Sequence, residues 1–375
     1  MLLRNCTFDE FEHRTKNSQV VCFGVGQYLD SILQNFPEAN FKISYFVDNN
    51  KTLWGKHKTI GDSFYIIQPP SFLFENLEKN TLVFITGGPE TGLEIFDELN
   101  KNSILDKTEC YLAHAVLAIH SDSLSYNTQQ PELGYRMNAQ PIIPKTIHYC
   151  WFGHGEMPKW NMECIESWRK FCPEYKIIEW NETNYDVTKN QYTNEAYRAK
   201  KWGFVPDYAR LDIIYQHGGI YLDVDVEIIH PLDELLYNSA FCGFDKTTQI
   251  NFGSGFGAVK QFDLMLKMMM KYDDLAFINE NGTYNLEPSP LYQTEVAVDC
   301  GLLLNGNFQV IDGMAFYPAE YFAPLSPLTL NMMKTDKTFS IHWYDASWFT
   351  QSEHKSRKKW KDLMTLAEEN EKSLS

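Results

Sequence analysis

Two aspartates, Asp223 and Asp225, stand one residue apart near the end of the stretch 205–228 and are the strongest candidates for chemistry in this chain. Two carboxylates held side by side repel each other, so a fold that keeps such a pair usually places a cation between or beyond them. Carboxylate oxygens are hard ligands that suit Mg²⁺ or Mn²⁺, and these ions commonly bridge to substrate phosphates. The pair therefore predicts a divalent metal site that receives a phosphorylated substrate.

A second pair, Asp207 and Arg210, precedes the aspartates. The two residues are about one helical turn apart, so they are expected to share one face of a helix. The planar guanidinium of arginine suits a phosphate or a carboxylate. The Asp-x-Asp spacing alone is weak evidence, and an ordinary polar strand face with an Asp–Arg pair on a helix is the simpler explanation of these four residues.

A helix, a glycine hinge and a strand are predicted to position these side chains. Proline near the start and apolar residues at helical spacing predict a helix over 205–217. Gly218 and Gly219 then end the helix, because glycine accepts the left-handed conformation that helix ends often need. Apolar and polar residues alternate over 220–228, which predicts one strand with both aspartates on its polar face. The hinge allows the helix face to fold back towards the end of this strand.

The whole stretch resembles the core of glycosyltransferase family 32, the Asp-x-Asp sugar transferases that include capsular-polysaccharide and Och1-like mannosyltransferases and are related to the glucosylating toxins. Seven residues carry the resemblance, namely Asp207, Arg210, Gly218, Gly219, Tyr221, Asp223 and Asp225. The segment 143–153 is similar to the opening strand of that family, and 342–348 is similar to its closing motif. The resemblance covers about 140–350 and implies an α/β protein with a GT-A-type nucleotide-diphospho-sugar transferase fold.

The resemblance implies a role for each matched residue. Asp223, Asp225 and His342 are the implied ligands of Mn²⁺ or Mg²⁺, and an imidazole is an acceptable ligand beside carboxylates. The implied catalytic residues are Asp207, Arg210, Asp223 and Asp225. The implied donor-binding residues are Trp151, Asp207, Arg210, Tyr221, Asn251, Ser347 and Trp348.

Several of these positions have simpler explanations. Trp151 follows an apolar strand, where a flat side chain can stack on a nucleobase, but a core tryptophan fits the same pattern. Asn251 precedes glycines that permit close approach to a sugar, although a glycine-loosened hairpin is slightly favoured. The helix that begins at Ser289 is expected to back the acceptor site, with Glu295 as a candidate contact. His148 lies in the middle of a predicted strand and is expected to be structural.

The resemblance implies a metal-dependent, retaining hexosyltransferase that moves a sugar from a nucleotide sugar, expected to be UDP-linked, to a polysaccharide or lipid-linked glycan. Capsular polysaccharide or lipopolysaccharide biosynthesis is the expected setting. A toxin-like protein glycosyltransferase is an alternative. A phosphatase of the haloacid-dehalogenase (HAD) type, acting on sugar phosphates, also begins with an apolar strand and Asp-x-Asp, but Glu227 stands where that class usually has Thr or Val. An inactive nucleotide-binding protein is the third alternative.

The N-terminal part of the chain lies outside the resemblance and predicts a small Rossmann-like α/β domain. One buried-strand run ends in Gly24-Val-Gly26, and the next ends in Asp48, which are two parts of the dinucleotide fingerprint. Leu29 stands where a third glycine or alanine is expected. A scaffold in which the glycines serve a tight turn is therefore favoured over a nucleotide site.

Composition indicates where the domains begin and end and which classes of partner and site are excluded. The expected domains are 1–125 Rossmann-like, 126–140 linker, 141–352 transferase and 353–375 a charged, solvated C-terminal helix. The net charge of −16 argues against nucleic acid as a partner, because phosphate backbones need a basic footprint. The eight scattered cysteines suggest neither a disulfide framework nor a zinc site.

The expected location is the cytoplasm, because the chain shows neither a signal peptide nor an apolar run of about 18 residues. Peripheral contact with the inner face of a membrane is left open. The basic residues that suggest such contact lie in the C-terminal helix and are Lys355, Arg357, Lys358, Lys359 and Lys361.

Overall fold

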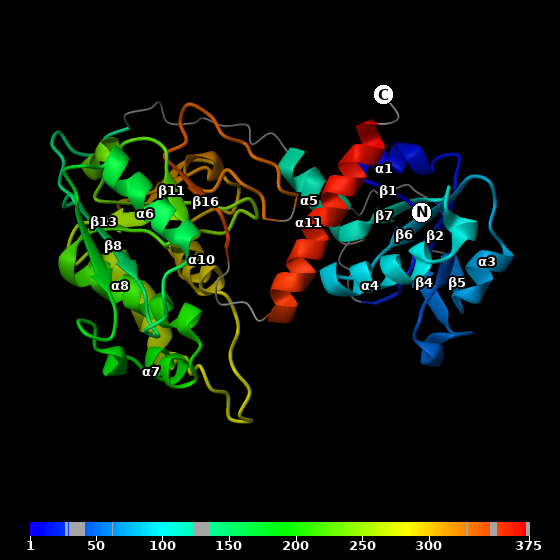
Figure 1. The fold of residues 1–375 in the computed structure, drawn as a ribbon, viewed down its shortest axis with the longest axis horizontal. Coiled ribbons are helices and arrows are strands. Elements are labelled where there is room, and N and C mark those ends of the chain that lie inside the picture. The colour runs from blue at the N-terminus through cyan, green and yellow to red at the C-terminus, as the bar shows by residue number, and fades with distance from the viewer. Residues whose placement is uncertain are drawn as a thin grey trace. The chain divides into compact units, whose positions relative to one another are not determined.

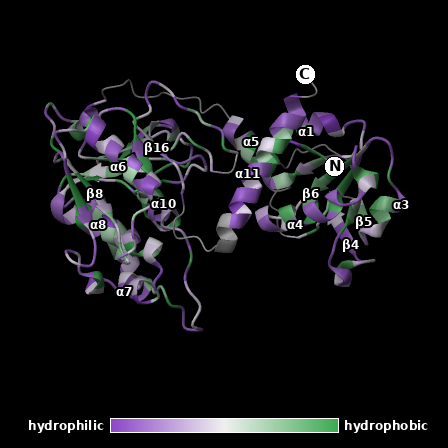
Figure 2. Ribbon diagram, viewed as in Figure 1, coloured by the Kyte–Doolittle hydropathy of each residue, from purple (hydrophilic) through white to green (hydrophobic). Residues whose placement is uncertain are grey.

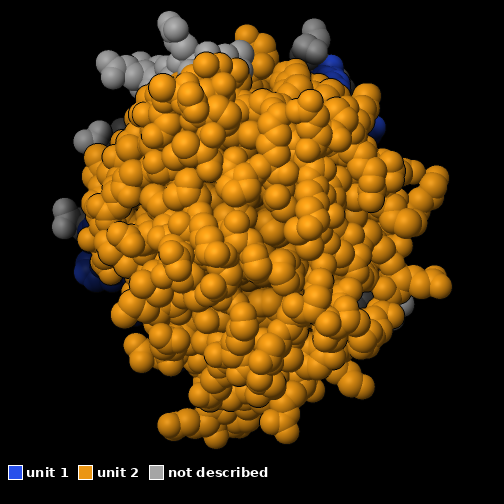
Figure 3. All heavy atoms as spheres, turned by 90° about the vertical axis from the view of Figure 1, so that its left-hand side faces the viewer, with its two compact units in different colours: residues 1–124, 328–330, 349–375 blue, residues 125–327, 331–348 orange. Residues whose placement is uncertain are grey.

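The computed structural model describes residues 1–26, 29, 42–61, 63–123, 135–327, 329–345 and 351–372. The chain separates into two compact units, which are coloured apart in Figure 3. Unit 1 consists of 1–124, 328–330 and 349–375, and unit 2 of 125–327 and 331–348. Each unit holds a seven-stranded sheet among its described residues, which confirms the predicted α/β class. The predicted bounds 1–125, 126–140, 141–352 and 353–375 stay a prediction.

Unit 1 is built on a largely parallel sheet with the strand order β1-β7-β6-β2-β3-β5-β4 (Figure 1). β4 alone of these strands pairs antiparallel, with β5. The central strands are continuously apolar and buried, as parallel strands covered on both faces should be. The strands are β1 Leu2–Arg4, β2 Gln19–Phe23, β3 Ile43–Val47, β4 His57–Ile60, β5 Ser63–Gln68, β6 Thr81–Ile85 and β7 Glu109–Leu112. The helices are α1 Phe8–Thr15, η1 Lys51–Leu53, α3 Ser71–Glu75, α4 Pro89–Asn100, η2 Ser103–Leu105, α5 Ala113–Ser123 and α11 Gln351–Lys372.

Asp48, the acidic residue of the incomplete dinucleotide fingerprint, accepts hydrogen bonds from nearby backbone amides. Asp48 Oδ2 accepts a hydrogen bond from the Val25 amide at 3.1 Å, and Asp48 Oδ1 accepts one from the Asn50 amide at 2.7 Å. These bonds join the turn after β2 to the end of β3. The carboxylate thus serves the fold of this turn, in agreement with the favoured scaffold interpretation.

The C-terminal helix α11 is not the solvated helix that the sequence suggested. Trp360, Met364 and Ala367 are buried in a core cluster of unit 1 that also contains residues of β1, β2 and β6. These side chains recur at helical spacing within a charged sequence, so one face of α11 is apolar while the rest is hydrophilic (Figure 2). None of the described helices combines the length and the apolar character that a membrane-spanning helix requires.

Unit 2 is built on a mixed sheet with the strand order β14-β15-β12-β13-β10-β8-β9, and β11 and β16 form a separate two-stranded sheet. The strands are β8 Thr146–Cys150, β9 Lys176–Trp180, β10 Gly219–Tyr221, β11 Val226–Ile228, β12 Ala240–Gly243, β13 Phe256–Ala258, β14 Gln309–Ile311, β15 Met314–Tyr317 and β16 Ser340–His342. The α-helices are α6 Lys159–Phe171, α7 Gln191–Arg198, α8 Val205–His217, α9 Asp263–Lys271 and α10 Ser289–Asp299. The short helices are η3 Val187–Lys189, η4 Trp202–Phe204, η5 Asp233–Tyr237, η6 Phe252–Ser254, η7 Tyr272–Asp274 and η8 Ala319–Tyr321.

The predicted helix and glycine hinge are confirmed. α8 ends at His217, and Gly218 and Gly219 follow with φ angles of 65° and 108°. A Cβ atom on Gly219 would lie 2.8 Å from the Thr146 carbonyl oxygen. Glycine is therefore required both for the turn and for the close approach of β10 to β8.

The prediction of one strand over 220–228 is wrong. β10 ends at Tyr221, and β11 begins at Val226 in the other sheet. The Asp223 amide donates to the Gly253 carbonyl at 3.1 Å, and the Val226 amide donates to the Asp223 carbonyl at 3.1 Å, which closes a turn. Asp223 and Asp225 therefore lie in the connection between two sheets, at the carboxyl end of β10.

His148 on β8 is structural, as expected. Its Nε2 atom lies 3.0 Å from the Gly218 carbonyl oxygen, and its Nδ1 atom lies 2.9 Å from Nε1 of Trp180. Since an indole nitrogen can only donate, His148 Nδ1 accepts this bond and the imidazole is neutral. Burial lowers the pKa of His148 to about 4, because the charged form is disfavoured away from water.

We expect this histidine to make the chain less stable in acid. In the unfolded chain the imidazole is protonated below about pH 6.5, whereas in the folded protein it stays neutral down to about pH 4. The free energy of unfolding should therefore decrease as the pH is lowered from about 6.5 to about 4, by about 3 kcal/mol for this one site. Urea unfolding at several pH values checks this. His148→Gln, which can still accept and donate, should have a shallower pH dependence; an unchanged slope would assign the acid sensitivity to other groups.

Candidate functional site

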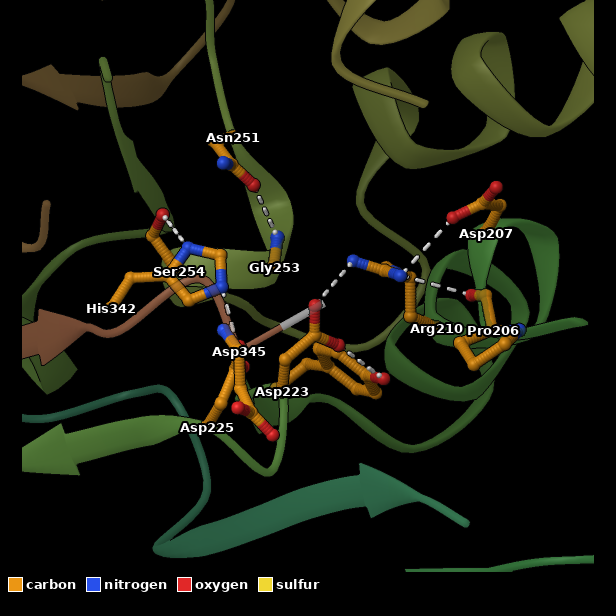
Figure 4. A network of polar contacts seen from close by, with 11 residues as sticks. Pro206, Asp207, Arg210, Asp223, Asp225, Asn251, Gly253, Ser254, His342 and Asp345 are labelled. Carbon is orange, nitrogen blue, oxygen red and sulfur yellow. Dashed lines mark hydrogen bonds and ion pairs between the residues drawn. The ribbon is translucent and has the colours of Figure 1, made fainter. Parts of the chain in front are cut away.

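Asp223, Asp225 and His342 form a cluster that is suited to a metal ion (Figure 4). One potential ligand atom from each residue lies within 4.8 Å of the others. Val226 pairs with His342 across the antiparallel strands β11 and β16, and this register brings the imidazole next to the aspartate turn. His342 Nε2 lies 3.3 Å from Asp225 Oδ1. Two carboxylates and an imidazole are a donor set that fits a divalent cation.

Neighbouring groups hold this cluster in place. Asp225 Oδ2 accepts a hydrogen bond of 2.7 Å from the Asp345 amide, and the Ser254 hydroxyl lies 3.0 Å from His342 Nδ1. Burial alone would raise the pKa of Asp225, but the charge of His342 and the hydrogen bonds from His342 and the Asp345 amide together lower this pKa. Burial alone would lower the pKa of His342, but the Asp225 carboxylate outweighs it and raises this pKa. Each residue of the pair thus favours the charged form of the other, and a metal ion would compete with the imidazole proton.

Arg210 joins α8 to the metal-suited cluster. Its guanidinium donates to Asp207 Oδ1 at 3.1 Å and to Asp223 Oδ2 at 3.4 Å. Its Nε also donates to the Pro206 carbonyl at 3.0 Å, and the guanidinium lies 5.1 Å from the centroid of the Tyr221 ring. Arg210 is thus fixed between two carboxylates, as Figure 4 shows.

The pKa values of the Asp207–Arg210 pair are shifted by their burial and by each other. Burial raises the pKa of Asp207 to about 7, although Arg210 acts in the opposite direction. Burial alone would lower the pKa of Arg210, but Asp223, Tyr221 and Asp207 together outweigh it and raise this pKa. Asp207 also accepts a long bond of 3.5 Å from the Tyr192 hydroxyl. Near neutral pH, Asp207 can accept or donate a hydrogen bond, which suits the hydroxyl groups of a sugar.

Gly253 permits a close approach between η6 and Asp223. A Cβ atom at this position would lie 2.3 Å from Asp223 Oδ2 and 3.3 Å from Arg210 Nη1. The Gly253 amide donates to Asn251 Oδ1 at 3.0 Å, so the side chain of Asn251 caps this turn. Asn251, a predicted donor-binding residue, is thereby placed beside the cluster (Figure 4).

The other predicted donor-binding residues differ in what surrounds them. Tyr221 is buried, and its hydroxyl donates to Asp223 Oδ1 at 3.0 Å. Trp151 directly follows β8, which runs parallel to β10, so Trp151 and Asp223 lie at the same edge of the sheet. The Trp151 indole donates to the Gly155 carbonyl at 2.7 Å. Ser347 and Trp348 lie outside the described residues.

Helix α10 contributes residues other than the one suggested by the sequence. Glu295 is exposed and pairs with Lys271 at 2.9 Å, so it is not brought to the cluster. Ser289, at the start of the helix, hydrogen-bonds Asp207 and lowers its pKa. Gln293, one turn further on, is buried, and neither of its amide atoms has a hydrogen-bond partner among the described residues. The helix was expected to back the acceptor site, but single polar residues in a helix form no recognisable motif, so neither Ser289 nor Gln293 was singled out.

Comparison with known proteins identifies part of unit 2. Residues 158–242 match the family described as "Glycosyltransferase sugar-binding region containing DXD motif". Inositol phosphoceramide mannosyltransferase 3 of Schizosaccharomyces pombe is 31% identical over 115 residues, which are 28% of this chain and 30% of that protein. Subversion of eukaryotic traffic protein A of Legionella pneumophila is 27% identical over 122 residues, or 25% of this chain and 19% of that protein. The chain thus spans less than a third of the length of either relative.

Two solved glycosyltransferases are also similar at low scores. PaToxG glycosyltransferase has a TM-score of 0.32 and 14% identity, over 42% of this chain and 68% of that one. Galactosyltransferase LgtC, in complex with donor and acceptor sugar analogs, has a TM-score of 0.24 and 13% identity, over 59% of this chain and 95% of that one. The identification rests instead on the family match, which includes both aspartates of the motif. Residues 158–242 therefore match a glycosyltransferase sugar-binding region containing a DXD motif, and Asp223 and Asp225 within them have the spacing of that motif, which confirms the resemblance seen in the sequence.

Proposed function

We propose that this protein is a metal-dependent, retaining glycosyltransferase that moves a sugar from a nucleotide sugar to a glycan acceptor. The observation that carries the proposal is the cluster of Asp223, Asp225 and His342, held beside the Asp207–Arg210 pair within a DXD glycosyltransferase region. The cluster provides ligands for a cation, and the adjacent pair provides groups that recognise phosphate and hydroxyl oxygens.

Each group has a proposed task. Asp223, Asp225 and His342 would hold Mn²⁺ or Mg²⁺, which neutralises the charge that develops on a departing nucleoside diphosphate. Arg210 is fixed by its bonds to Asp207 and Asp223, so little of its conformational freedom would be lost on binding a donor oxygen. Asp207 would orient a hydroxyl of the donor sugar.

The remaining donor contacts follow the resemblance. Trp151 would stack on the nucleobase at the edge of the sheet, and Asn251 would contact the transferred sugar. Ser347 and Trp348 would contact the diphosphate. The proposed stereochemistry is retention, with the acceptor attacking the same face of the sugar that the diphosphate leaves.

The proposed donor is a UDP-sugar, and the proposed acceptor is a polysaccharide or a lipid-linked glycan, as in capsular polysaccharide or lipopolysaccharide assembly. The relative from S. pombe is named as an inositol phosphoceramide mannosyltransferase, so mannose and a lipid-borne acceptor also belong among the candidates. The proposed compartment is the cytoplasm, where thiols stay reduced, and the eight free cysteines of the chain support it.

A panel of nucleotide sugars tests the proposal. The full chain is incubated with each donor in Mn²⁺, in Mg²⁺ or in EDTA, and the released nucleoside diphosphate is measured. We expect one donor to be consumed in the presence of metal and none in EDTA. Release of phosphate from sugar phosphates without any need for a nucleotide sugar would identify a phosphatase. Nucleotide binding that is indifferent to metal and to Asp225→Asn would identify a binding protein.

Gln293→Leu is expected to lower activity while raising stability. The buried amide lacks a partner among the described residues, and replacing such a group by an apolar one of similar size should increase the free energy of unfolding by about 1 kcal/mol. If a donor or acceptor hydroxyl supplies the missing partner, kcat/KM should fall about tenfold or more. Glu295→Leu, on the exposed face of the same helix, is the matched control and should retain kcat/KM. If Gln293→Leu kept the wild-type kcat/KM, Gln293 would not contact the donor or the acceptor.

A further inference from the structure

The ring of Tyr344 packs against the imidazole of His342, which belongs to the cluster suited to a metal ion. The two ring centroids are 4.1 Å apart, and the ring planes are inclined by 33°. Flat rings at this separation are in contact. One face of the imidazole is therefore covered by a residue that is itself none of the three potential ligands.

The backbone at Tyr344 has a conformation that a tyrosine seldom adopts. Its φ angle is 51°, in the left-handed region, where a bulky residue other than glycine is uncommon. Asp225 accounts for this turn because it binds the residues on both sides. Its carbonyl oxygen accepts a hydrogen bond from the Trp343 amide at 3.1 Å, and its carboxylate accepts one from the Asp345 amide at 2.7 Å. A proposed metal ligand thus fixes the backbone that carries the Tyr344 ring.

The two aromatic residues of this segment have different neighbours. Trp343 packs edge-on against Trp160 of α6, with the ring centroids 5.5 Å apart, and its indole donates to Glu227 Oε2 at 3.1 Å. Tyr344 instead contacts His342. The contact with the imidazole is therefore particular to Tyr344, and Trp343 offers a comparison within the same turn.

The hydroxyl of Tyr344 does not account for the position of the ring. It is buried and forms no hydrogen bond of good geometry with any described residue. Burial raises the pKa of Tyr344, while Ser254 and Asn251 near the hydroxyl act in the opposite direction. Since the hydroxyl has no firm partner, the ring is the part of this side chain that acts on the cluster.

The ring supplies a constraint on His342 that the contacts at its nitrogens do not supply. The Ser254 hydroxyl lies 3.0 Å from Nδ1, and Asp225 Oδ1 lies 3.3 Å from Nε2, as Figure 4 shows. Contacts at the edge of the ring tolerate some rotation of its plane, because hydrogen-bond angles vary widely. An imidazole binds a metal ion through a lone pair in the ring plane, so a ring packed on its face helps to aim Nε2 at the cation.

We propose that Tyr344 is a positioning residue, whose ring holds the imidazole of His342 in the orientation that binds the cation. The inference rests on the proposed function, because it adds a supporting side chain to the metal site which that function requires. It also gives the left-handed turn a purpose, since strained backbone persists at functional sites where the surrounding structure enforces it.

Two substitutions at Tyr344 separate the ring from the hydroxyl. Tyr344→Leu removes the ring but keeps a Cβ atom, so the backbone strain is unchanged, and the Mn²⁺ affinity measured by calorimetry should fall about tenfold. Tyr344→Phe keeps the ring and should restore the wild-type affinity. Trp343→Leu is the matched control, because it removes a ring that packs on α6, and it should bind Mn²⁺ nearly as the wild type does. The visible spectrum of bound Co²⁺, which depends on ligand geometry, should change in Tyr344→Leu alone.

The outcomes distinguish this inference from the proposed function. Wild-type affinity in Tyr344→Leu, or an equal loss in Tyr344→Phe or Trp343→Leu, would overturn the positioning role while the wild type still bound Mn²⁺. A wild type that bound neither Mn²⁺ nor Co²⁺ would refute both the role and the metal site. Tyr344 is half-buried in the connection after β16, so circular dichroism should show each variant to be folded.

Discussion

Asp225→Asn is expected to abolish metal-dependent sugar transfer while the protein stays folded. Asparagine keeps an oxygen that can accept the bond from the Asp345 amide, so the turn after β10 is preserved. The substitution removes the charge that raises the pKa of His342 and would share a cation with Asp223. Loss of one preorganised electrostatic contact to a reacting group typically costs about 100- to 1,000-fold in rate, and we expect kcat/KM to fall by at least this factor.

The measurement is Mn²⁺ binding by calorimetry, together with release of the nucleoside diphosphate. Glu227→Gln is the matched control, because Glu227 lies two residues further on and accepts a bond from Trp343 Nε1 at 3.1 Å, which glutamine can also accept. It should bind Mn²⁺ nearly as tightly as the wild type does. Unchanged Mn²⁺ affinity and turnover in Asp225→Asn would refute the proposal that this cluster holds the catalytic metal ion.

Gly253→Ala is expected to damage the same site without altering any ligand. The added Cβ atom would lie 2.3 Å from Asp223 Oδ2. Tyr221 and Arg210 hold that carboxylate by hydrogen bonds of 3.0 and 3.4 Å, so it cannot move aside without breaking one of them. We expect Mn²⁺ affinity to fall about 10- to 100-fold, as it does when groups that orient a metal ligand are lost. The crowding should also cost about 1–3 kcal/mol of the free energy of unfolding.

Calorimetry with Mn²⁺ and urea unfolding measure the two effects separately. Gly155→Ala is a suitable control in the same unit, because a Cβ atom there would meet nothing within 4 Å. It should change neither quantity by more than about 0.5 kcal/mol. If Gly253→Ala bound Mn²⁺ as the wild type does, the position of Asp223 would be unimportant for the cation, and the cluster would lose its proposed role.

The helix and the hinge were predictable because their signals are local. Proline in the first turn and glycines after the last are read within one stretch of sequence, and α8 ends where expected. The break between β10 and β11 was not predictable in this way. The alternation over 220–228 fits a single strand, but long-range partners, Gly253 for Asp223 and His342 for Val226, divide it between two sheets. The alternation of residue types therefore predicts a strand, but pairing with distant segments decides where each strand begins and ends.

The site residues also fall into two groups, those that a sequence motif predicts and those that only tertiary contacts bring to the site. Asp207, Arg210, Asp223, Asp225 and His342 belong to recognisable motifs, and the structure gathers them. The residues that support them are Tyr192, Ser254 and Ser289, which stand alone in the sequence, and Asp345, which lies in the closing segment but contacts Asp225 through its backbone amide. Their roles depend on contacts between distant segments, so no motif announces them. The buried face of α11 was missed because charged residues outnumber Trp360, Met364 and Ala367 in its sequence.

The turn between β10 and β11 limits where residues can be inserted into the chain. Surface connections generally accept extra residues, because their length matters little to the sheets that they join. This connection spans only 222–225 and carries both aspartates, while its two ends are fixed by pairing in different sheets. One inserted residue would shift Asp225 relative to His342 or pull β11 out of register with β16. A segment that looks like a loop thus has the length constraint of a buried strand.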